Sequence, residues 1–258
     1  MTLRSSVDRK GDAPVTQANI LDGLVELGVR PGMELEVHSS LSSFGHVEGG
    51  ASAVITALMQ AVGPQGSLFM PALRLSPELP LTDEDERLGI TRKIRILSPD
   101  AKRSGMGMIA DTFRCLPDVA VGEGIFRVCA WGRSAPCVQQ GFEYLLKNDG
   151  MGLLLGVDIY RLTAMHAVEH LLPQRVRNIF APTQEMCRIY SPDQWFIEAG
   201  APPVNAWYTI QRLAIERRLI REGTIGPCRC MLFRLRDVVG LYEQALREQP
   251  LQLYGLGV

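Results

Sequence analysis

One stretch in the second half of the chain combines residues that can do chemistry. Thr163 to Leu171 reads T-A-M-H-A-V-E-H-L and contains the pattern H-x-x-E-H. Two histidines at this spacing can hold Zn²⁺ with the glutamate as general base, as in one class of zinc peptidase. Alternatively, one imidazole can take a proton near neutral pH while the carboxylate one turn away orients the ring and stabilises the imidazolium. The third interpretation is a packed helix with one buried, hydrogen-bonded histidine and a solvated edge.

The spacing permits all three interpretations but supports zinc least. On an α-helix successive residues turn by about 100°, so His166 would lie about 60° from Glu169 and about 40° from His170, on one face. A catalytic zinc ion also needs a third protein ligand. The other two histidines, His38 and His46, lie far upstream. The metal would therefore need a ligand that no recognisable second motif supplies.

A second stretch has the composition of a binding loop. Residues 39–45 read S-S-L-S-S-F-G, and Gly49 and Gly50 follow. Hydroxyls, free backbone N–H groups and the dipole of a following helix all favour an anion. The stretch has neither the G-K-[ST] of a P-loop nor the glycine spacing of a dinucleotide-binding turn. It is therefore either a loop that receives a phosphate-bearing ligand or an ordinary turn.

The elements around these two stretches predict the fold class. Thr16 can cap a helix that ends at Gly28, and a strand, an amphipathic helix and a second strand are expected over 33–38, 51–62 and 67–70. This order is typical of a βαβ unit, so we expect a single α/β domain with a central mixed, largely parallel sheet flanked by helices. The other expected elements are a buried strand over 152–157, the helix of the H-x-x-E-H motif, a helix over 210–220, a strand over 229–233 and a helix over 237–247.

Length and composition bound the class of protein. The chain has 258 residues, 46% hydrophobic and 21% charged, with a net charge of -1, which predicts a globular protein that can bury a sizeable core. We expect residues 1–14 to form a frayed tail, 15–258 to form the domain, and 74–103, with prolines and an acidic run at 83–86, to form a small surface insertion. No block of basic residues favours a nucleic-acid or membrane partner.

The location follows from what the sequence lacks. No apolar run approaches the roughly 18 residues of a membrane span, and the polar N-terminus lacks the apolar centre of a signal peptide. We therefore expect a cytoplasmic protein with reduced cysteines. Cys228 and Cys230 form C-x-C, which in a strand places both side chains on one face and suits packing.

Taken together, these segments resemble the aminoglycoside 3-N-acetyltransferase family. Residues 27–71, which include V-H-S-S-L-S-S-F-G, look like the N-terminal signature of that family along nearly their whole length. Residues 153–170, L-L-L-G-V followed by T-A-M-H-A-V-E-H, form the second match. Residues 104–117, S-G-M-G-M-I-A-D-T-F-R-C-L-P, form a weaker third match. The three segments stand in the family's order.

The resemblance implies a reaction and a set of site residues. Enzymes of this family transfer acetyl from acetyl-CoA to the 3-amino group of the 2-deoxystreptamine ring, which gives antibiotic resistance, and need no metal. His166 matches the general base, and Glu169 the carboxylate that orients it. Ser39 and Ser40 match the hydroxyl-bearing loop that receives CoA. A second CoA-contacting segment comprises Ser104, Gly105, Met106, Gly107 and Met108.

The chemistry agrees with these residue types. An ammonium group cannot attack a thioester until it has lost a proton, which His166 can take directly or through a water molecule. Backbone N–H groups of the Ser39–Ser40 turn could bind the oxyanion of the tetrahedral intermediate. No cysteine lies in the two stronger matches, residues 27–71 and 153–170, which favours direct attack by the amine. The polycationic acceptor should bind among carboxylates, for which Asp158 and the run 83–86 are the candidates.

Three departures from the family pattern concern the acceptor side. Residues 120–132, A-V-G-E-G-I-F-R-V-C-A-W-G, stand where many members carry Arg-Ser-x-His-Pro; Ala72 replaces a threonine, and Leu162 replaces a frequent asparagine. A related acyl-CoA-dependent transferase that acts on a non-antibiotic amine is therefore the main alternative. An H-x-x-E-H zinc hydrolase and a non-catalytic CoA-binding protein are the others. A homodimer is one of the assemblies open to the chain.

Overall fold

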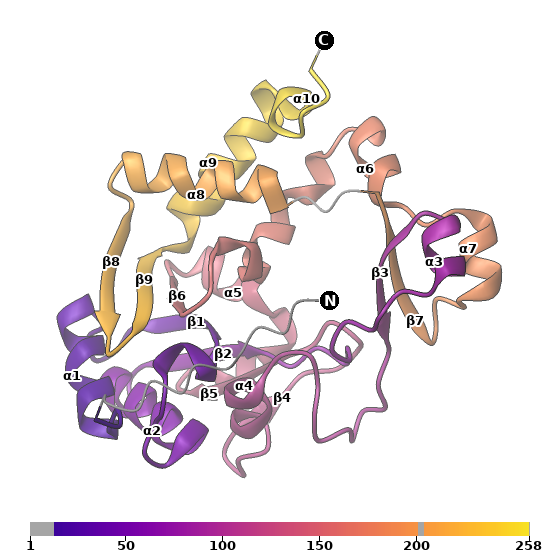
Figure 1. The fold of residues 1–258 in the computed structure, drawn as a ribbon. Coiled ribbons are helices and arrows are strands. Elements are labelled where there is room, and N and C mark those ends of the chain that lie inside the picture. The colour runs from indigo at the N-terminus through magenta and orange to yellow at the C-terminus, as the bar shows by residue number, and fades with distance from the viewer. Residues whose placement is uncertain (1–12, 201–203, 258) are drawn as a thin grey trace.

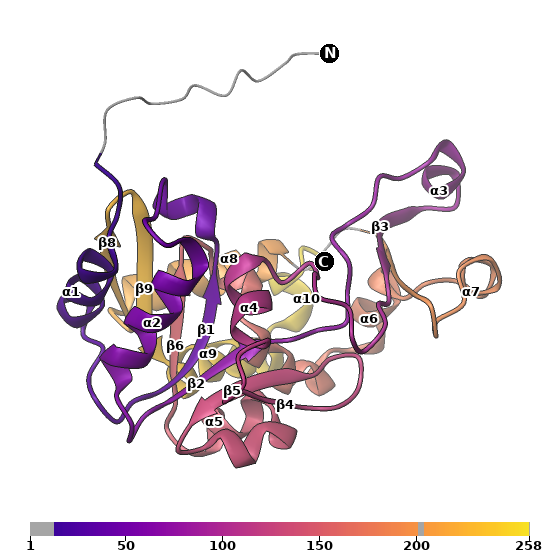
Figure 2. The same cartoon turned by 90° about the horizontal axis from the view of Figure 1, so that it is seen from below.

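The computed structural model describes residues 13–200 and 204–257. Helices lie on both faces of a seven-stranded sheet with the order β4-β5-β2-β1-β6-β9-β8 (Figures 1 and 2). A single α/β domain with a mixed central sheet, as expected, is confirmed. The strands are β1 (Glu34–Ser39), β2 (Ser67–Pro71), β4 (Ala120–Val121), β5 (Val128–Gly132), β6 (Met151–Leu155), β8 (Ile220–Ile225) and β9 (Cys228–Arg234).

Parallel pairing occupies the centre of the sheet. Strand β1 pairs in parallel with β2 on one side and with β6 on the other. The four outer pairings are antiparallel, so the parallel share is smaller than the one βαβ unit suggested. One cause is local: only Gly226 and Pro227 separate β8 from β9, and so short a connection can join antiparallel strands alone.

The two faces of the sheet bury different cores. Along β6, Leu153 and Leu155 face one core and Leu154 faces the other, as strand alternation requires. The first core includes both cysteines of β9, Cys228 and Cys230, whose sulfur atoms lie 3.9 Å apart, as expected for one face. Helices of the first core are α1 (Gln17–Leu27), α2 (Gly50–Val62) and α4 (Met108–Phe113); those of the second are α5 (Phe142–Lys147), α8 (Val204–Glu216) and α9 (Leu235–Glu248).

Helix boundaries follow local chemistry. Thr16 and Asn19 form the capping box of α1, and Gly28 ends the helix with a φ of 111°, as the sequence predicted. The helix expected over 210–220 is α8, which ends at residue 216 because Arg218 has a positive φ of 58°. Of the tail expected over 1–14, only residues 13 and 14 belong to the described part of the chain.

The insertion over 74–103 belongs to a second, smaller sheet. It contributes α3 (Asp83–Arg87) and β3 (Ile90–Arg95), and β3 pairs antiparallel with β7 (Trp195–Ala199) from much later in the chain. Asp85 is buried, pairs with Lys93 and accepts a hydrogen bond from Tyr190. Burial alone would raise the pKa of Asp85, but these two partners outweigh it and lower that pKa.

The smaller sheet has a core of its own, in which Ile90, Met186 and Ile197 are buried. It stands beside the main sheet together with α6 (Gln174–Phe180) and α7 (Gln184–Ile189) (Figure 2). The last helix is α10 (Pro250–Leu253). Within 13–200 and 204–257, no helix is long and apolar enough to cross a bilayer.

The segment of the H-x-x-E-H motif is a 3₁₀ helix and not the expected α-helix. This helix, η4, covers Thr163–Leu171 and follows the short 3₁₀ helix η3 (Ile159–Arg161). Extended residues at Leu162 and Leu172 bound it, and neither end continues into a longer helix. Packing of Ala164, Met165 and Val168 against the second core holds the segment in place. In a 3₁₀ helix residues i and i+3 lie directly above each other, which changes the face expected from α-helical geometry.

Candidate active site

The carboxyl ends of β1 and β6 lie side by side because the two strands are adjacent and parallel. Strand β1 leads into the serine-rich loop, with its 3₁₀ helix η1 (Leu41–Phe44), and β6 leads toward η4. The chain passes from β1 to β2 on one side of β1, and later in the sequence β6 pairs with β1 on its other side. Such a reversal of strand order leaves a crevice at the carboxyl ends, the usual ligand site of open α/β sheets.

A direct contact fixes the serine loop to the end of β6. Ser43 Oγ donates a hydrogen bond to the carbonyl of Gly156, at 3.0 Å. Gly156 has a φ of 70°, and a Cβ there would lie 2.1 Å from Cβ of Ser43. The close approach therefore requires glycine at this position.

His166 and Glu169 form the expected pair. His166 Nδ1 lies 2.6 Å from Glu169 Oε2, since the 3₁₀ helix stacks residues three apart. A carboxylate can only accept, so Nδ1 carries the hydrogen and Nε2 keeps its lone pair. The His166 side chain is 58% exposed, which leaves Nε2 accessible to a ligand. The arrangement is that of a general base with its orienting carboxylate.

His170 does not join this pair. Residues four apart on a 3₁₀ helix point about 120° from each other, and His170 Nδ1 instead donates to the carbonyl of Ala167, at 3.1 Å. The expectation that both histidines share a face is therefore wrong. The two side chains are not placed to bind one zinc ion together. Among the residues that the structure describes, no group of three His, Cys, Asp or Glu side chains is placed to hold a metal ion.

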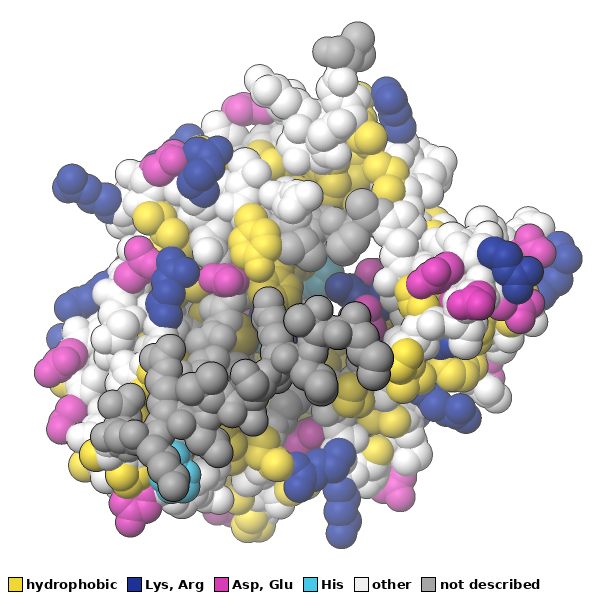
Figure 3. Space-filling view, viewed as in Figure 1, with side chains coloured by type: hydrophobic (Ala, Val, Ile, Leu, Met, Phe, Trp, Pro, Cys, Tyr) yellow, Lys and Arg dark blue, Asp and Glu magenta, His cyan; other side chains and the backbone are white. Residues whose placement is uncertain are grey.

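Neighbouring charges strengthen His166 as a base. Removal of the ring from bulk water acts to lower its pKa, but the hydrogen bond to Glu169 and the charges of Glu169, Glu198 and Glu36 outweigh this and raise it. Trp207 of α8 packs edge-to-face on the ring, with centroids 4.9 Å apart. The ring is thus open to solvent on one side and enclosed by protein on another. Figure 3 shows a hollow in this face where histidine, acidic and basic side chains gather.

The smaller sheet brings acidic side chains toward this base. Arg92 Nη1 lies 2.9 Å from Glu198 Oε2, and Arg92 Nε lies 3.5 Å from Glu78 Oε2. Burial raises the pKa of Glu198, against the opposing effects of Arg92 and His166. Sequence reasoning missed both glutamates, because Glu198 meets Arg92 only through the pairing of β3 with β7, and Glu78 joins them only through Arg92. A basic residue in one strand and an acid in another gave no signal before that pairing was known.

Asp158 occupies a different position from the one expected of an acceptor ligand. Its Oδ1 accepts from Gln211 Nε2 at 3.1 Å and lies 3.7 Å from Arg229 Nη1. No hydrogen bond or ion pair of the described residues joins Asp158 to His166 or Glu169. Its role in binding the acceptor stays a prediction.

The acidic run 83–86 divides into two parts. Asp85 faces the core of the smaller sheet, where Lys93 neutralises it. The other three acids are exposed on α3. Of the four acids, only the three exposed ones remain candidates for contact with a cationic acceptor.

The two serines at the end of β1 lie at the carboxyl edge of the sheet, as expected. Ser39 ends β1, and Ser40 Oγ lies 3.1 Å from Ser42 Oγ. The backbone N–H of Ser40 donates to the carbonyl of Leu155 at 2.9 Å. That N–H is therefore already used, and it cannot serve as the oxyanion donor hypothesised from the sequence. Binding of CoA by the two hydroxyls stays a prediction.

The segment of Ser104 to Met108 is held by its own hydrogen bonds. Ser104 donates from its N–H and its Oγ to the two carboxylate oxygens of Asp111, each at 2.7 Å. Gly105 N–H donates to the carbonyl of Leu75, at 2.7 Å. Met106 contacts the first core, and Gly107, with a φ of 90°, leads into α4, which packs against α2. The segment is thus linked to the serine loop through α2, while its contact with CoA stays a prediction.

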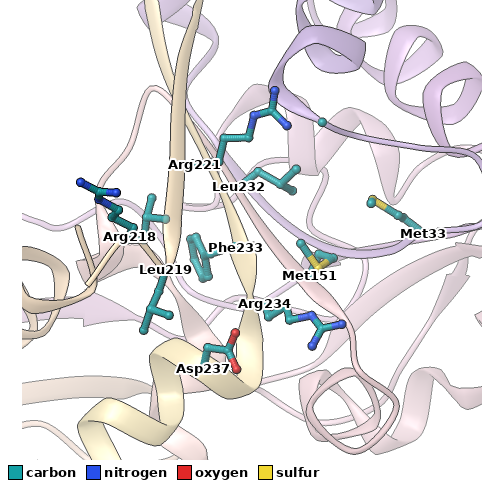
Figure 4. Close-up of a pocket in the computed structure, with 11 residues that line it drawn as sticks. Met33, Met151, Arg218, Leu219, Arg221, Leu232, Phe233, Arg234 and Asp237 are labelled. Atoms are coloured by element: carbon teal, nitrogen blue, oxygen red, sulfur yellow. The ribbon is translucent and has the colours of Figure 1, made fainter. Parts of the chain in front are cut away.

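A separate pocket lies at the opposite end of the sheet (Figure 4). Its volume is about 540 Å³, and it includes Met33, before β1, and Met151, at the start of β6. None of the site residues predicted from the sequence lines it. Because parallel strands place their ligand sites at the carboxyl edge, this pocket is not the reaction site. The other lining residues are Gly28, Arg218, Leu219, Ile220, Arg221, Leu232, Phe233, Arg234 and Asp237.

Comparison with known proteins gives one consistent family. The sequence pattern of aminoglycoside 3-N-acetyltransferases matches residues 37–247, which include every site residue predicted above. The chain is 28% identical over 267 residues to the SPbeta prophage-derived aminoglycoside N(3')-acetyltransferase-like protein YokD of Bacillus subtilis (strain 168), covering 90% of this chain and 92% of that protein. It is also 28% identical over 268 residues to aminoglycoside N(3)-acetyltransferase III of Serratia marcescens, covering 87% of this chain and 94% of that protein.

The fold agrees with the sequence match. The crystal structure of the apoenzyme of aminoglycoside acetyltransferase AAC(3)-IVa superposes with a TM-score of 0.68 and 25% sequence identity. The superposition covers 93% of this chain and 91% of that chain. The similarity therefore extends over most of both chains.

Proposed function

The chain belongs to the aminoglycoside 3-N-acetyltransferase family, and we propose that it transfers acetyl from acetyl-CoA to the 3-amino group of a 2-deoxystreptamine aminoglycoside, with His166 as the general base. Membership of this family makes it an acyltransferase. The observation that carries the rest of the proposal is the His166–Glu169 pair at the carboxyl edge of β1 and β6.

The reaction needs few groups. Nε2 of His166 takes a proton from the acceptor amine, directly or through water, and Glu169 stabilises the imidazolium that forms. The amine nitrogen attacks the thioester carbonyl, forming the C–N bond, and the C–S bond then breaks. The attacking nitrogen, which entered as an ammonium, gives up its second proton to water as the tetrahedral intermediate collapses. The departing thiolate takes the first proton from His166, which restores the neutral imidazole. The products are the acetylated amine and CoA, with no acetyl-enzyme in between.

The serine loop is the proposed site of CoA. Ser39 and Ser40 supply hydroxyls at the edge from which His166 is reached, and the contact between Ser43 and Gly156 keeps the loop in register with β6. The segment from Ser104 to Met108 completes this side through its packing on α2. The thioester would thus lie between the serine loop and the 3₁₀ helix.

The acceptor is proposed to enter from the side of the smaller sheet. An aminoglycoside carries several ammonium groups, so it binds best where carboxylates gather. Glu198 and Glu78 present such charges, and Arg92 already pairs with both. Glu198 also acts electrostatically on His166, so an ammonium near Glu198 is close to the base.

Mass spectrometry tests the proposed reaction. The protein is incubated with acetyl-CoA and a panel of 2-deoxystreptamine aminoglycosides, and the product is fragmented to locate the added group. One acetyl on the 3-amino nitrogen is the expected result. Acetylation at another nitrogen would overturn the regiochemistry. No acetylation by a folded protein that binds CoA would overturn the proposed acceptor class.

A second acceptor class has one specific observation behind it. Phe126, in the segment 120–132 that departs from the family pattern, is 61% exposed and packs edge-to-face on Phe196 of β7, with centroids 6.1 Å apart. Glu198 lies two residues further along the same strand. A changed segment against this strand would alter the acceptor side first, so a non-antibiotic amine is the alternative substrate. The same assay with other polyamines, and with His166→Ala as control, decides between the two.

A further inference from the structure

Two polar side chains of the central strand face the segment that carries the base. Leu35 and Val37 of β1 face the first core, so Glu36 and His38 face the second, where η4 packs. Glu36 is 0% exposed and His38 is 6% exposed. Polar residues in the middle of a buried central strand are costly unless they have partners.

The partners are the first residues of the 3₁₀ helix. Glu36 Oε1 accepts from the backbone N–H of Ala164 at 3.1 Å and lies 2.8 Å from His38 Nε2. His38 Nε2 also lies 3.4 Å from the backbone N of Thr163. The shorter distance favours the tautomer in which His38 donates from Nε2 to Glu36.

These contacts replace a missing cap. The first N–H groups of a helix lack acceptors within it, and a side chain at the N-cap position usually supplies one. The N-cap residue of η4 is Leu162, whose side chain has no hydrogen-bond acceptor. Strand β1 provides the acceptor instead, from a residue more than a hundred positions away. A carboxylate is well suited to this end of a helix, where the peptide dipoles favour negative charge.

The second oxygen of Glu36 is unusual. Oε2 is buried, and no hydrogen-bond partner for it exists among the described residues. A carboxylate that served only to hold the helix could be replaced by a neutral amide at no loss of that hydrogen bond. A buried charge that is only half satisfied is costly, so the hydrogen bond to Ala164 alone does not account for a carboxylate at this position.

We propose that Glu36 is a positioning residue, which holds the first turn of η4 against β1 and places a fixed negative charge behind His166. The first half of this role concerns the folded protein alone. The second half acts on the general base and so rests on the proposed function. His38 supports the carboxylate by donating to it.

Other groups that face His166 set the background. Glu169 acts from its own helix, Glu198 acts from β7 with Arg92 of β3 beside it, and Trp207 of α8 covers one edge of the ring. Helices α9 and α5 also pack on η4 and contribute the buried Tyr242 and Phe142. Glu36 is the one acid among these that comes from the main sheet.

The test is the titration of the His166 ring by nuclear magnetic resonance. The chain has four histidines, so the signal of His166 is assigned from its loss in His166→Gln. In Glu36→Gln the pKa of His166 should fall by on the order of one to two units, as expected for one charge lost at several ångströms in a medium of effective dielectric near 20. An unchanged pKa would overturn the electrostatic part of the proposal.

Glu34→Gln is the matched control. Glu34 lies on the same strand and the same face, is 9% exposed, and contacts Ser134 and Arg133 but not η4. Its replacement should leave the titration of His166 unchanged. An equal fall in both variants would mean that any charge on β1 has this effect, which contradicts a specific role for Glu36.

A measurement on the unaltered protein covers the case in which Glu36→Gln does not fold. The amide of Ala164 should exchange its hydrogen slowly, because its N–H is buried against Glu36. Exchange as fast as that of an exposed amide would show that Glu36 does not cap η4. Neither this measurement nor the titration depends on turnover, so a failure of the proposed function would leave the result on Glu36 standing, and the reverse holds as well.

Discussion

Ser43 and Gly156 touch across the carboxyl edge of the sheet, where a hydroxyl of the serine loop donates to the carbonyl at the end of β6 and leaves no room for a Cβ. The two proposed substrate sides meet at this contact: the loop offered to CoA and the segment that leads to His166. A change at either residue should therefore be felt in the binding of one substrate and in the alignment of both.

Gly156→Ala tests this contact. The left-handed backbone there costs a residue with a Cβ roughly 1–2 kcal/mol, and the overlap with Ser43 adds to that. The variant should unfold at lower temperature and show a raised KM for acetyl-CoA. Gly32→Ala is the control, because its φ of 85° is also positive while no atom lies within 4 Å of the added Cβ. Equal losses in both variants would mean that the overlap with Ser43 has no effect.

His166→Ala should abolish transfer while acetyl-CoA binding stays nearly intact, because the base acts on the amine. A lost general base lowers kcat by about 10²- to 10⁴-fold. His170→Ala is the comparison, since His170 lies on the same 3₁₀ helix and its exposed side chain donates to the carbonyl of Ala167. Steady-state kinetics and calorimetric binding of acetyl-CoA measure the two quantities. Wild-type turnover in His166→Ala would show that His166 is not the general base.

Glu169→Gln should move the pH dependence in a stated direction. His166 must be neutral to accept a proton, so kcat/KM should rise with pH through its pKa. Although enclosure by protein acts to lower that pKa, the hydrogen bond and charge of Glu169 help to raise it. Without this charge the pKa falls, and the acid limb of the profile moves to lower pH while the plateau drops. A limb that moves to higher pH, or does not move, would contradict the pairing.

Ser39→Ala combined with Ser40→Ala should raise the KM for acetyl-CoA more than the KM for the acceptor. Both hydroxyls lie at the edge assigned to the thioester, and neither carries a structural hydrogen bond like the one from Ser104 to Asp111. Ser104→Ala should instead lower stability, since it leaves a buried carboxylate with one partner fewer. The KM values and the unfolding midpoints separate the two effects. An unchanged KM for acetyl-CoA would show that the serine loop is not part of the acetyl-CoA site.

Glu198→Gln should raise the KM for a polycationic aminoglycoside by about tenfold, the effect of losing one charge-assisted hydrogen bond. The KM for acetyl-CoA should not change. Asp158→Asn is the comparison, because Asp158 is the acceptor ligand expected from the sequence and Glu198 the one suggested by the structure. Asp158 already contacts Gln211 and Arg229, so its replacement should change the acceptor KM less. If Asp158→Asn has the larger effect on the acceptor KM, the acceptor binds beside Asp158 and not beside Glu198.

Local signals in the sequence were sufficient for the elements that end in clear chemistry. Thr16 and Gly28 bound α1, and the strand before Ser39 ends close to the predicted place. The pairing of His166 with Glu169 was also foreseeable, because their spacing brings them together in either kind of helix. What periodicity could not decide was the kind of helix, which here follows from extended residues at both ends and from packing.

Tertiary pairing accounts for what the sequence left out. Glu198 and Arg92 become neighbours only when β3 and β7 pair, and these strands are a hundred residues apart. The use of the Ser40 N–H by Leu155 likewise depends on the register of β1 against β6. Glu36 alternates with Leu35 and Val37 along β1, which is the pattern of a strand with one solvated face, so no signal in the sequence indicated that Glu36 is buried.

The smaller sheet, with its separate core around Ile90, Met186 and Ile197, contributes none of the residues assigned to acetyl transfer. It contributes side chains assigned to the acceptor, one of which, Glu198, also helps to raise the pKa of His166. Amino-acid changes can therefore accumulate in that unit, and alter which amines are admitted, while the base, its carboxylate and the thioester loop stay as they are. For protein engineering, sequence libraries confined to residues 74–103 and 174–200, with Glu198 kept, would vary the acceptor side while the base, its carboxylate and the serine loop stay unchanged.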